Sequence, residues 1–272
     1  MNCVAVIQMA SGPNVTPNLN EAGRLLDMAA GQGAKLAVLP ENFAIMGMGQ
    51  NDLVKAGEHL GRGPIQDFLA RRAQELGLWI VGGTVPVLAS PGKVHAVAML
   101  FNPSGKVVAH YNKIHLFDVQ IEETGEEYTE SQTVEPGNSV VVVDTPFGRL
   151  GLAVCYDLRF PELFRSMLDA GVQLIAVPSA FTAITGKAHW EILVRARAIE
   201  NLSYVLAAGQ GGYHYNGRET FGDSMIVDPW GNVLNRHAKG NGVVCANVDI
   251  QYVERVRAQF PVVEHRRLRC AE

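Results

Sequence analysis

Three side chains that could share one reaction each follow directly on an apolar, strand-like run. They are Glu41, Lys113 and Cys155. A cysteine thiol can attack a carbonyl carbon, a carboxylate can take the proton of that thiol, and a lysine ammonium can stabilise the resulting oxyanion. Because α/β folds place their sites at the carboxyl ends of strands, these positions suit catalysis by a cysteine nucleophile.

Each of the three residues also has a plainer interpretation when it is taken alone. Cys155 could be a small buried hydrophobe, Glu41 a solvated loop residue and Lys113 a surface lysine. In favour of catalysis, a helix is expected to begin at Pro161 shortly after Cys155. The start of that helix could donate N–H groups and lower the pKa of the thiol.

The elements that must position these residues alternate along the chain. Short β-branched runs alternate with helical patterns, which is typical of an α/β sandwich rather than of separate α and β domains. The first helix is expected to begin at a capping box formed by Asn18 and Glu21. Further helices are expected over 64–76, 161–170 and 188–202, and strands over 3–9, 35–39, 78–84, 93–101, 106–111, 139–144, 149–154, 172–177, 203–208, 222–228 and 242–248.

An internal similarity indicates how the strands are grouped. The stretch 35–43 resembles 173–181, and each follows a strand and a helix, as the second strand of a βαβ unit does. Two such units suggest two sheets in pseudo-symmetric halves. No linker or change of composition divides them, so one domain is expected over residues 1–272.

The composition excludes several classes of protein. The chain is 47% hydrophobic and carries 23 basic against 27 acidic residues, so a sizeable core is expected and a nucleic-acid partner is not. Four well-separated cysteines without a CxxC pair indicate neither a disulfide framework nor a zinc site, and His110 and His115 lack further metal ligands. No secretory signal or membrane-length apolar run is present. A cytoplasmic protein that binds no metal and no membrane is expected.

The residues around the three side chains form extended motifs. They read Leu-Pro-Glu-Asn-Phe around Glu41, Tyr-Asn-Lys-Ile-His-Leu-Phe around Lys113 and Cys-Tyr-Asp-Leu-Arg-Phe-Pro-Glu from Cys155. Their order and spacing resemble the nitrilase superfamily of carbon-nitrogen hydrolases. The likeness continues through nearly the whole chain, including 178–181, 186–191, 195–200 and 228–231.

This resemblance implies a four-layer α-β-β-α sandwich with a catalytic triad of Glu41, Lys113 and Cys155 and no metal or organic cofactor. It also implies a second active-site glutamate, which matches Glu130 best among the glutamates of 122–130. The oxyanion is expected to be held by Lys113 and the backbone N–H of Tyr156.

The residues after the nucleophile indicate a branch of the superfamily. Cyanide-type nitrilases have Trp-Glu where this chain has Tyr156-Asp157, which is similar to the Nit amidases. Within that branch, the motifs over 178–186, 196–200 and 261–267 look closest to enzymes that hydrolyse deaminated glutathione to 2-oxoglutarate and cysteinylglycine. The alternatives are an ω-amidase acting on 2-oxoglutaramate or 2-oxosuccinamate, another short-chain aliphatic amidase, an inactive scaffold, and a redox-sensing thiol protein.

A small amide substrate that bears carboxylates needs polar groups beyond the triad. Arg159, Thr182 and Thr185 are candidates for binding it. Arg159 could instead pair with a carboxylate that shapes the cysteine turn. Arg195 and Arg197 are expected on the polar side of their helix.

Two helices carry more apolar residues than one narrow stripe needs, which favours packing in a deep core or on a partner. The superfamily pairs its helical layers across a two-fold axis, so the resemblance implies a homodimer. The residues expected to provide this surplus apolar surface are Phe164, Met167, Leu168, Trp190, Leu193 and Val194.

Overall fold

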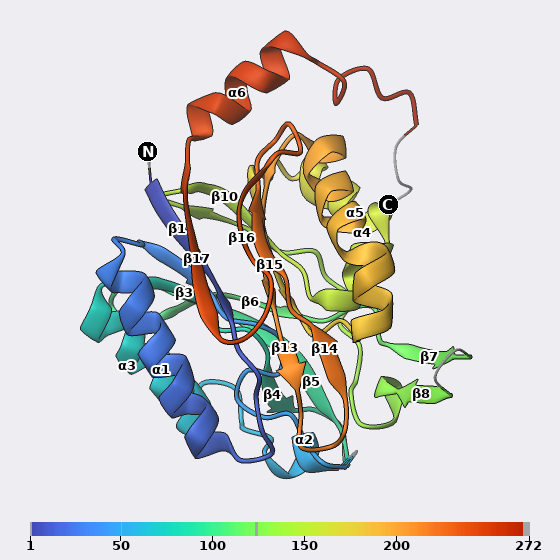
Figure 1. Ribbon diagram of the computed structural model, residues 1–272. Coiled ribbons are helices and arrows are strands. Elements are labelled where there is room, and N and C mark those ends of the chain that lie inside the picture. Colours follow the sequence, from blue (N-terminus) through green and yellow to red (C-terminus); the bar gives the residue numbers. More distant parts are fainter. Residues whose placement is uncertain (1, 50, 123–124, 269–272) are drawn as a thin grey trace.

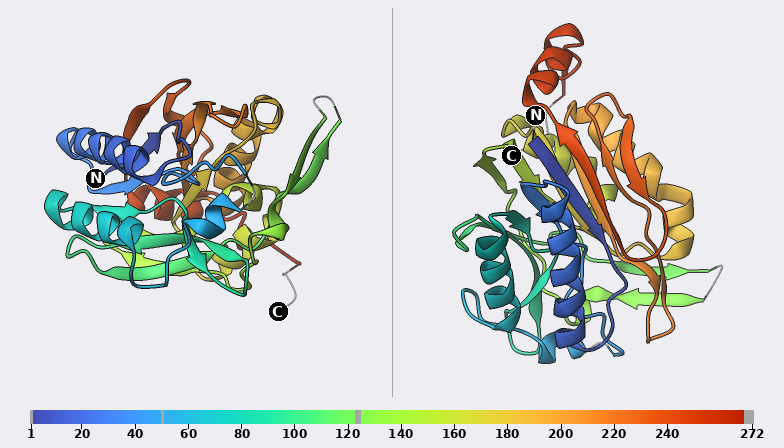
Figure 2. Two further views of the ribbon diagram at one scale, coloured as in Figure 1. Left: turned by 90° about the horizontal axis from the view of Figure 1, so that it is seen from below. Right: turned by 60° about the vertical axis from the view of Figure 1, so that its left-hand side comes forward.

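The computed structural model describes residues 2–49, 51–122 and 125–268. Two β-sheets stack face to face, and helices cover the outer face of each (Figures 1 and 2). The α-β-β-α order of layers that the sequence predicts is therefore confirmed, and the two related stretches, 35–43 and 173–181, contribute strands to different sheets.

The first sheet is built mostly from the N-terminal half of the chain and closed by the last strand. Its parallel centre, β1-β2-β3, is continued by antiparallel strands on both sides. In spatial order its strands are β17 (Gly242–Val248), β1 (Asn2–Gln8), β2 (Leu36–Val38), β3 (Trp79–Val81), β5 (Val94–Phe101) and β4 (Val85–Leu88), and β6 (Val107–Asn112) also pairs with β5.

The second sheet has the same plan, with a parallel centre, β10-β11-β12, between antiparallel edges. In spatial order its strands are β16 (Val233–His237), β15 (Ser224–Val227), β12 (Tyr204–Gly209), β11 (Leu174–Ser179), β10 (Gly148–Leu152) and β9 (Val142–Thr145). Two separate hairpins lie outside both sheets: β7 (Asp118–Ile121) with β8 (Glu126–Thr129), which projects from the body in Figure 2, and β13 (Gly211–Tyr213) with β14 (Glu219–Phe221).

The helices form the two outer layers. α1 and α3 pack on the first sheet, and α4 and α5 on the second (Figure 1). The helices are α1 (Val15–Gly31), α2 (Asp52–Lys55), α3 (Pro64–Leu76), α4 (Pro161–Asp169), α5 (Ala183–Asn201) and α6 (Ile250–Gln259), with 3₁₀ turns η1 (Glu130–Gln132) and η2 (Cys155–Arg159).

Strand β1 shows how the sequence divides the core. Val4 and Val6 belong to the apolar cluster between the two sheets, whereas Ala5 and Ile7 belong to the cluster under α1 and α3. Successive side chains of a strand point to opposite faces. A strand that is apolar at every position is therefore the expected inner element of a four-layer fold.

The start of α1 differs from the prediction. The helix begins at Val15, and Asn18 is a buried residue inside it rather than its cap. The Asn18 side chain instead bonds the N–H and C=O of Gly12 and the C=O of Ala44. Glu21 pairs with Arg24 within the helix and also accepts a bond of 2.7 Å from the Asn241 side-chain amide. The expected capping box was wrong because these two side chains serve tertiary contacts.

The apolar residues of α4 and α5 are also placed differently from the expectation. Phe164, Met167, Trp190 and Val194 are buried within this one chain, and Met167 packs against Gly151. They are core residues and provide no surplus surface. Leu168 and Leu193 are half-buried. The exposed apolar side chains on α5 are Ile184, Ile192 and Ile199, of which Ile192 is the most accessible, at 69%.

Candidate active site

Cys155 opens the turn η2, directly after β10. Its φ of +47° lies in the left-handed region, which residues with a side chain rarely adopt. The turn is held by Asp157, whose fully buried carboxylate accepts hydrogen bonds from the Val154 N–H and the Tyr111 hydroxyl, both at 2.8 Å. The same carboxylate bonds the backbone N–H and ring Nδ1 of His115 at 3.1 and 2.7 Å. These bonds tie the cysteine turn to the segment after β6.

The Cys155 thiol is almost fully buried, with 8% of the residue exposed. The Ala180 N–H, just past the end of the neighbouring parallel strand β11, donates to its Sγ at 3.4 Å. Burial raises the pKa of the thiol well above its usual value, and the Glu41 carboxylate raises it further, against the opposite effect of Lys113 and the Ala180 N–H. The lowering expected from the start of α4 is therefore wrong. The thiol therefore rests in its neutral, protonated form.

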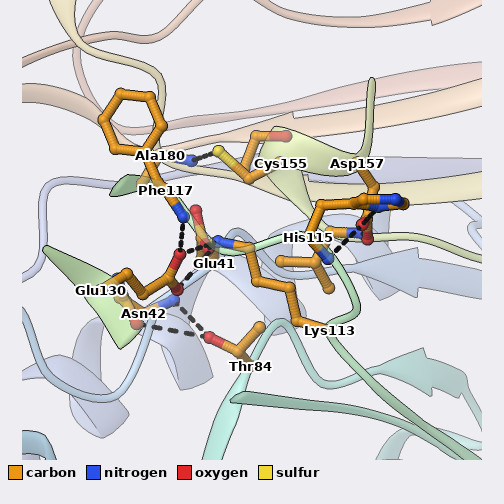
Figure 3. A network of polar contacts seen from close by, with 12 residues as sticks. Glu41, Asn42, Thr84, Lys113, His115, Phe117, Glu130, Cys155, Asp157 and Ala180 are labelled. Carbon is orange, nitrogen blue, oxygen red and sulfur yellow. Dashed lines mark hydrogen bonds and ion pairs between the residues drawn. The ribbon is translucent and has the colours of Figure 1, made fainter. Parts of the chain in front are cut away.

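Lys113 follows β6 and lies between two carboxylates (Figure 3). Its Nζ is 2.8 Å from Glu41 Oε1 and 2.9 and 2.8 Å from the two oxygens of Glu130. Lys113 is only 2% exposed. Burial alone would lower the pKa of its ammonium, but the carboxylates of Glu130 and Glu41 outweigh it and raise that pKa well above its usual value. The lysine is thus a fixed cation.

Glu130 begins the 3₁₀ turn η1, and its carboxylate bonds Lys113 rather than Cys155. One of its oxygens also accepts the Phe117 N–H at 2.6 Å. Burial raises the pKa of Glu130, an effect that Lys113 opposes and Glu41 reinforces. Among the described glutamates of 122–130, Glu130 is the one that pairs with Lys113.

Glu41 is held at the turn that follows β2. It is 4% exposed, and its carbonyl oxygen accepts a bond of 2.9 Å from the Gln210 side chain. The next residue, Asn42, has a φ of +55° and donates its N–H to Thr84 Oγ1 at 2.8 Å. Glu41 and Cys155 therefore come from different sheets into one site, in which Figure 3 shows them close together.

These residues line a cavity of about 380 Å³. Tyr156, whose backbone N–H is expected to bind an oxyanion, lies in the cavity wall. It is the second residue of η2, and N–H groups at the start of a helix have no partner within that helix. The expected substrate-binding residues Arg159, Thr182 and Thr185 line it too. Thr182 is also the cap of α5, since its hydroxyl accepts the Thr185 N–H at 3.3 Å.

Arg159 lies against rings rather than against an acid. Its guanidinium lies 5.7 Å from the ring centre of Tyr156 and 5.3 Å from that of Phe181, and its Nη1 is 3.2 Å from His189 Nδ1. No carboxylate of the described residues forms an ion pair with Arg159. The carboxylate partner considered for Arg159 is therefore not part of this structure.

Several residues of the site had no signal in the sequence. In the sequence Asp157 is a marker of the branch, and nothing there indicates that its carboxylate fixes the cysteine turn. Arg197, expected on a polar face, is 5% exposed and donates two bonds, of 2.9 and 2.6 Å, to the Leu158 carbonyl at the far end of that turn. Arg218 and Met46 enter the cavity from loops. The positions of such side chains depend on packing between distant segments.

The other chemically reactive groups lie apart from this site. Cys3 and Cys245 are free, half-buried thiols on the neighbouring strands β1 and β17, and Cys270 lies outside the described residues. Within the described ranges, no group of three His, Cys, Asp or Glu side chains could hold a metal ion. In that same part of the chain, no helix is long and apolar enough to cross a membrane.

Comparisons with known proteins agree with this geometry. A carbon-nitrogen hydrolase family model matches residues 3–258. A deaminated glutathione amidase of Synechocystis is 43% identical over 266 residues, which cover 96% of this chain and 97% of the relative. The crystal structure of Saccharomyces cerevisiae Nit3, described as a member of branch 10 of the nitrilase superfamily, superposes with a TM-score of 0.87 at 30% identity, covering 98% of this chain and 97% of Nit3.

The C. elegans NitFhit protein is similar over part of its length. Its structure has a TM-score of 0.91 at 36% identity, covering 98% of this chain, whereas the chain spans only 65% of NitFhit. The family match, the sequence identity and the fold thus indicate the same family. The chain belongs to the carbon-nitrogen hydrolase family and is an amidase of the nitrilase superfamily.

Proposed function

We propose that this amidase hydrolyses deaminated glutathione to 2-oxoglutarate and cysteinylglycine, with Cys155 as its nucleophile. The observation that carries the chemistry is the buried group of a neutral thiol, a carboxylate and a fixed ammonium around one cavity. The substrate is supported by the Synechocystis relative, which bears the name deaminated glutathione amidase and matches nearly the whole chain.

The first half of the reaction forms a thioester. Glu41 takes the proton of Cys155 as the sulfur attacks the amide carbonyl carbon. The oxyanion receives hydrogen bonds from the Lys113 ammonium and the Tyr156 N–H. Glu41 then gives its proton to the amide nitrogen, the C–N bond breaks and cysteinylglycine leaves.

The second half hydrolyses that thioester. Glu41, again a carboxylate, takes a proton from a water molecule, whose oxygen attacks the thioester carbonyl. The C–S bond breaks, the Cys155 sulfur regains its proton from Glu41, and 2-oxoglutarate leaves. Glu130 acts as a positioning residue in both halves, because its two oxygens hold the Lys113 ammonium in place.

The proposal extends to the organisation of the protein. It comprises one catalytic domain over 1–272, in the reducing environment of the cytoplasm, which would keep Cys155 a thiol. It also comprises a homodimer that pairs the α4–α5 layers of two copies. Exposed Ile184, Ile192 and Ile199 follow one face of α5 and support such an apolar contact.

A substrate panel followed by mass spectrometry tests the function. Deaminated glutathione, 2-oxoglutaramate and simple aliphatic amides are each incubated with wild type and with Cys155→Ser. Wild type should release 2-oxoglutarate fastest from deaminated glutathione, and Cys155→Ser should release none. Faster turnover of 2-oxoglutaramate would instead indicate an ω-amidase, and no turnover of any amide would contradict the proposal.

A further inference from the structure

We propose that Arg218 is a specificity residue that binds a carboxylate on the amine side of the scissile amide. This inference rests on the proposed function and deepens it, since it assigns the group that recognises the cysteinylglycine half of the substrate. The supporting observations are the contacts of the Arg218 guanidinium and the position of this side chain among the residues that line the cavity.

The backbone of Arg218 is fixed at the turn of the β13–β14 hairpin. The His214 N–H donates to the Arg218 carbonyl at 2.9 Å, and the Arg218 N–H donates to Asn216 Oδ1 at 3.1 Å. The Asn216 amide also donates to the Gly47 carbonyl at 2.8 Å, which joins the hairpin to the loop after β2. The side chain of Arg218 therefore starts from a well-defined position at the cavity.

The guanidinium of Arg218 hydrogen-bonds the Tyr128 hydroxyl but has few other polar partners. It lies over the ring of Tyr128, with 4.6 Å between its Cζ and the ring centre, and its Nη1 is 4.0 Å from Met46 Sδ. Its Nε is buried and lacks a hydrogen-bond partner, and no carboxylate of the described residues forms an ion pair with it. A guanidinium that is partly desolvated against an aromatic ring and has free N–H groups suits a carboxylate ligand.

Arg159 and Arg218 reach the cavity from different segments of the chain. Arg159 lies on the same turn as Cys155, against Phe181 at the start of α5. Arg218 contacts Met46 in the loop that continues from Glu41. Since Glu41 hands its proton to the leaving nitrogen, the wall that continues from Glu41 is the one that faces the leaving group.

The chemistry of the proposed substrate matches this arrangement. Deaminated glutathione has a carboxylate at each end, and the scissile amide lies between the 2-oxoglutaryl and cysteinylglycine halves. With the carbonyl carbon at Cys155, the 2-oxo acid carboxylate lies toward Arg159 and the glycine carboxylate toward Arg218. The side chains of Ile45, Met46 and Met48 line the cavity on the Arg218 side and offer apolar, polarisable contacts for the cysteinyl thiol.

The test compares two substrates that differ only in the group assigned to Arg218. These are deaminated glutathione and its C-terminal amide, in which the glycine carboxylate is neutral. Wild type should prefer the free acid by about 10- to 100-fold in kcat/KM, the range expected for a charged hydrogen bond. Arg218→Gln should remove this preference by slowing cleavage of the acid, and Arg218→Lys should retain part of it.

Arg159→Gln is the matched control, because it removes the other guanidinium of the same cavity. It should lower kcat/KM for both peptides together and keep the preference for the free acid. Circular dichroism melting curves of all three variants establish that each is folded.

The outcomes separate this inference from the proposed function. If wild type cleaves both peptides equally well, or if folded Arg218→Gln keeps the preference, the role of Arg218 is refuted while the function stands. If wild type cleaves 2-oxoglutaramate but neither peptide, the proposed substrate fails, and the assignment of Arg218 fails with it.

Discussion

Replacing Glu41 by glutamine should slow turnover and, at the same time, make the nucleophile easier to ionise. The pKa of the Cys155 thiol is raised well above its usual value of about 9 by burial and by the Glu41 charge. At pH 7 such a thiol is ionised in less than roughly 1% of molecules. Without a base, attack depends on that fraction, so Glu41→Gln should lower kcat by at least about 100-fold, or about 2.7 kcal/mol in activation free energy.

The same substitution removes a negative charge beside the sulfur, so the pKa of the thiol should fall. Release of 2-oxoglutarate measures the first effect, and the pH dependence of Cys155 alkylation by iodoacetamide, followed by peptide mass spectrometry, measures the second. Wild-type alkylation should still be rising at pH 9, and the Glu41→Gln profile should lie at lower pH. Glu127→Gln, the same chemical change at an exposed residue of the cavity rim, is the control. A variant that keeps more than a tenth of kcat, or whose profile moves to higher pH, would refute this reasoning.

Three further sets of variants test other parts of the structure. Lys113→Ala should lower kcat by at least about 100-fold, the effect of losing one oxyanion donor. Glu130→Ala should also lower kcat. A larger loss of kcat in Glu127→Ala than in Glu130→Ala would show that the second active-site glutamate is not Glu130. Burial lowers the pKa of His214, so below about pH 6.5 the unfolded chain binds a proton more readily than the folded chain. As the pH falls through this range, the free energy of unfolding should decrease by up to about 1.4 kcal/mol per pH unit. The melting temperature should therefore depend less on pH between about pH 5 and 7 in His214→Gln than in wild type, and an unchanged dependence would contradict this. Ile192→Glu should convert the proposed dimer to monomers in light scattering, whereas a persistent dimer would exclude that face.

The sequence predicted the strands that carry the triad because these strands have strong local signals. β2 lies in the apolar run before Glu41, β10 lies in the apolar run before Cys155, and β6 directly precedes Lys113. Short strands were missed. β13, with the sequence Gly-Gly-Tyr, and β8, with Glu-Glu-Tyr-Thr, have no strand pattern of their own and exist because a partner strand pairs with them.

The parts of the site that the sequence could not predict depend on contacts between distant segments. Arg218 meets Met46 across 172 positions of the chain, and neither residue stands at the end of a strand in the sheets. The burial of Met167 depends on the absence of a side chain at Gly151, on a strand packed beneath its helix. Periodicity shows that a helix residue is apolar, but it does not show whether the same chain or a second copy covers it.

The left-handed backbone at Cys155 restricts which nucleophiles this turn can accept. At a φ of +47° a β-branched side chain is strongly disfavoured, since its second branch crowds the backbone. Serine has the unbranched shape of cysteine and fits the turn, whereas threonine does not. Of the two small hydroxyl side chains, only serine therefore fits this turn, and random mutagenesis at position 155 should recover folded threonine variants only where the turn has been rebuilt.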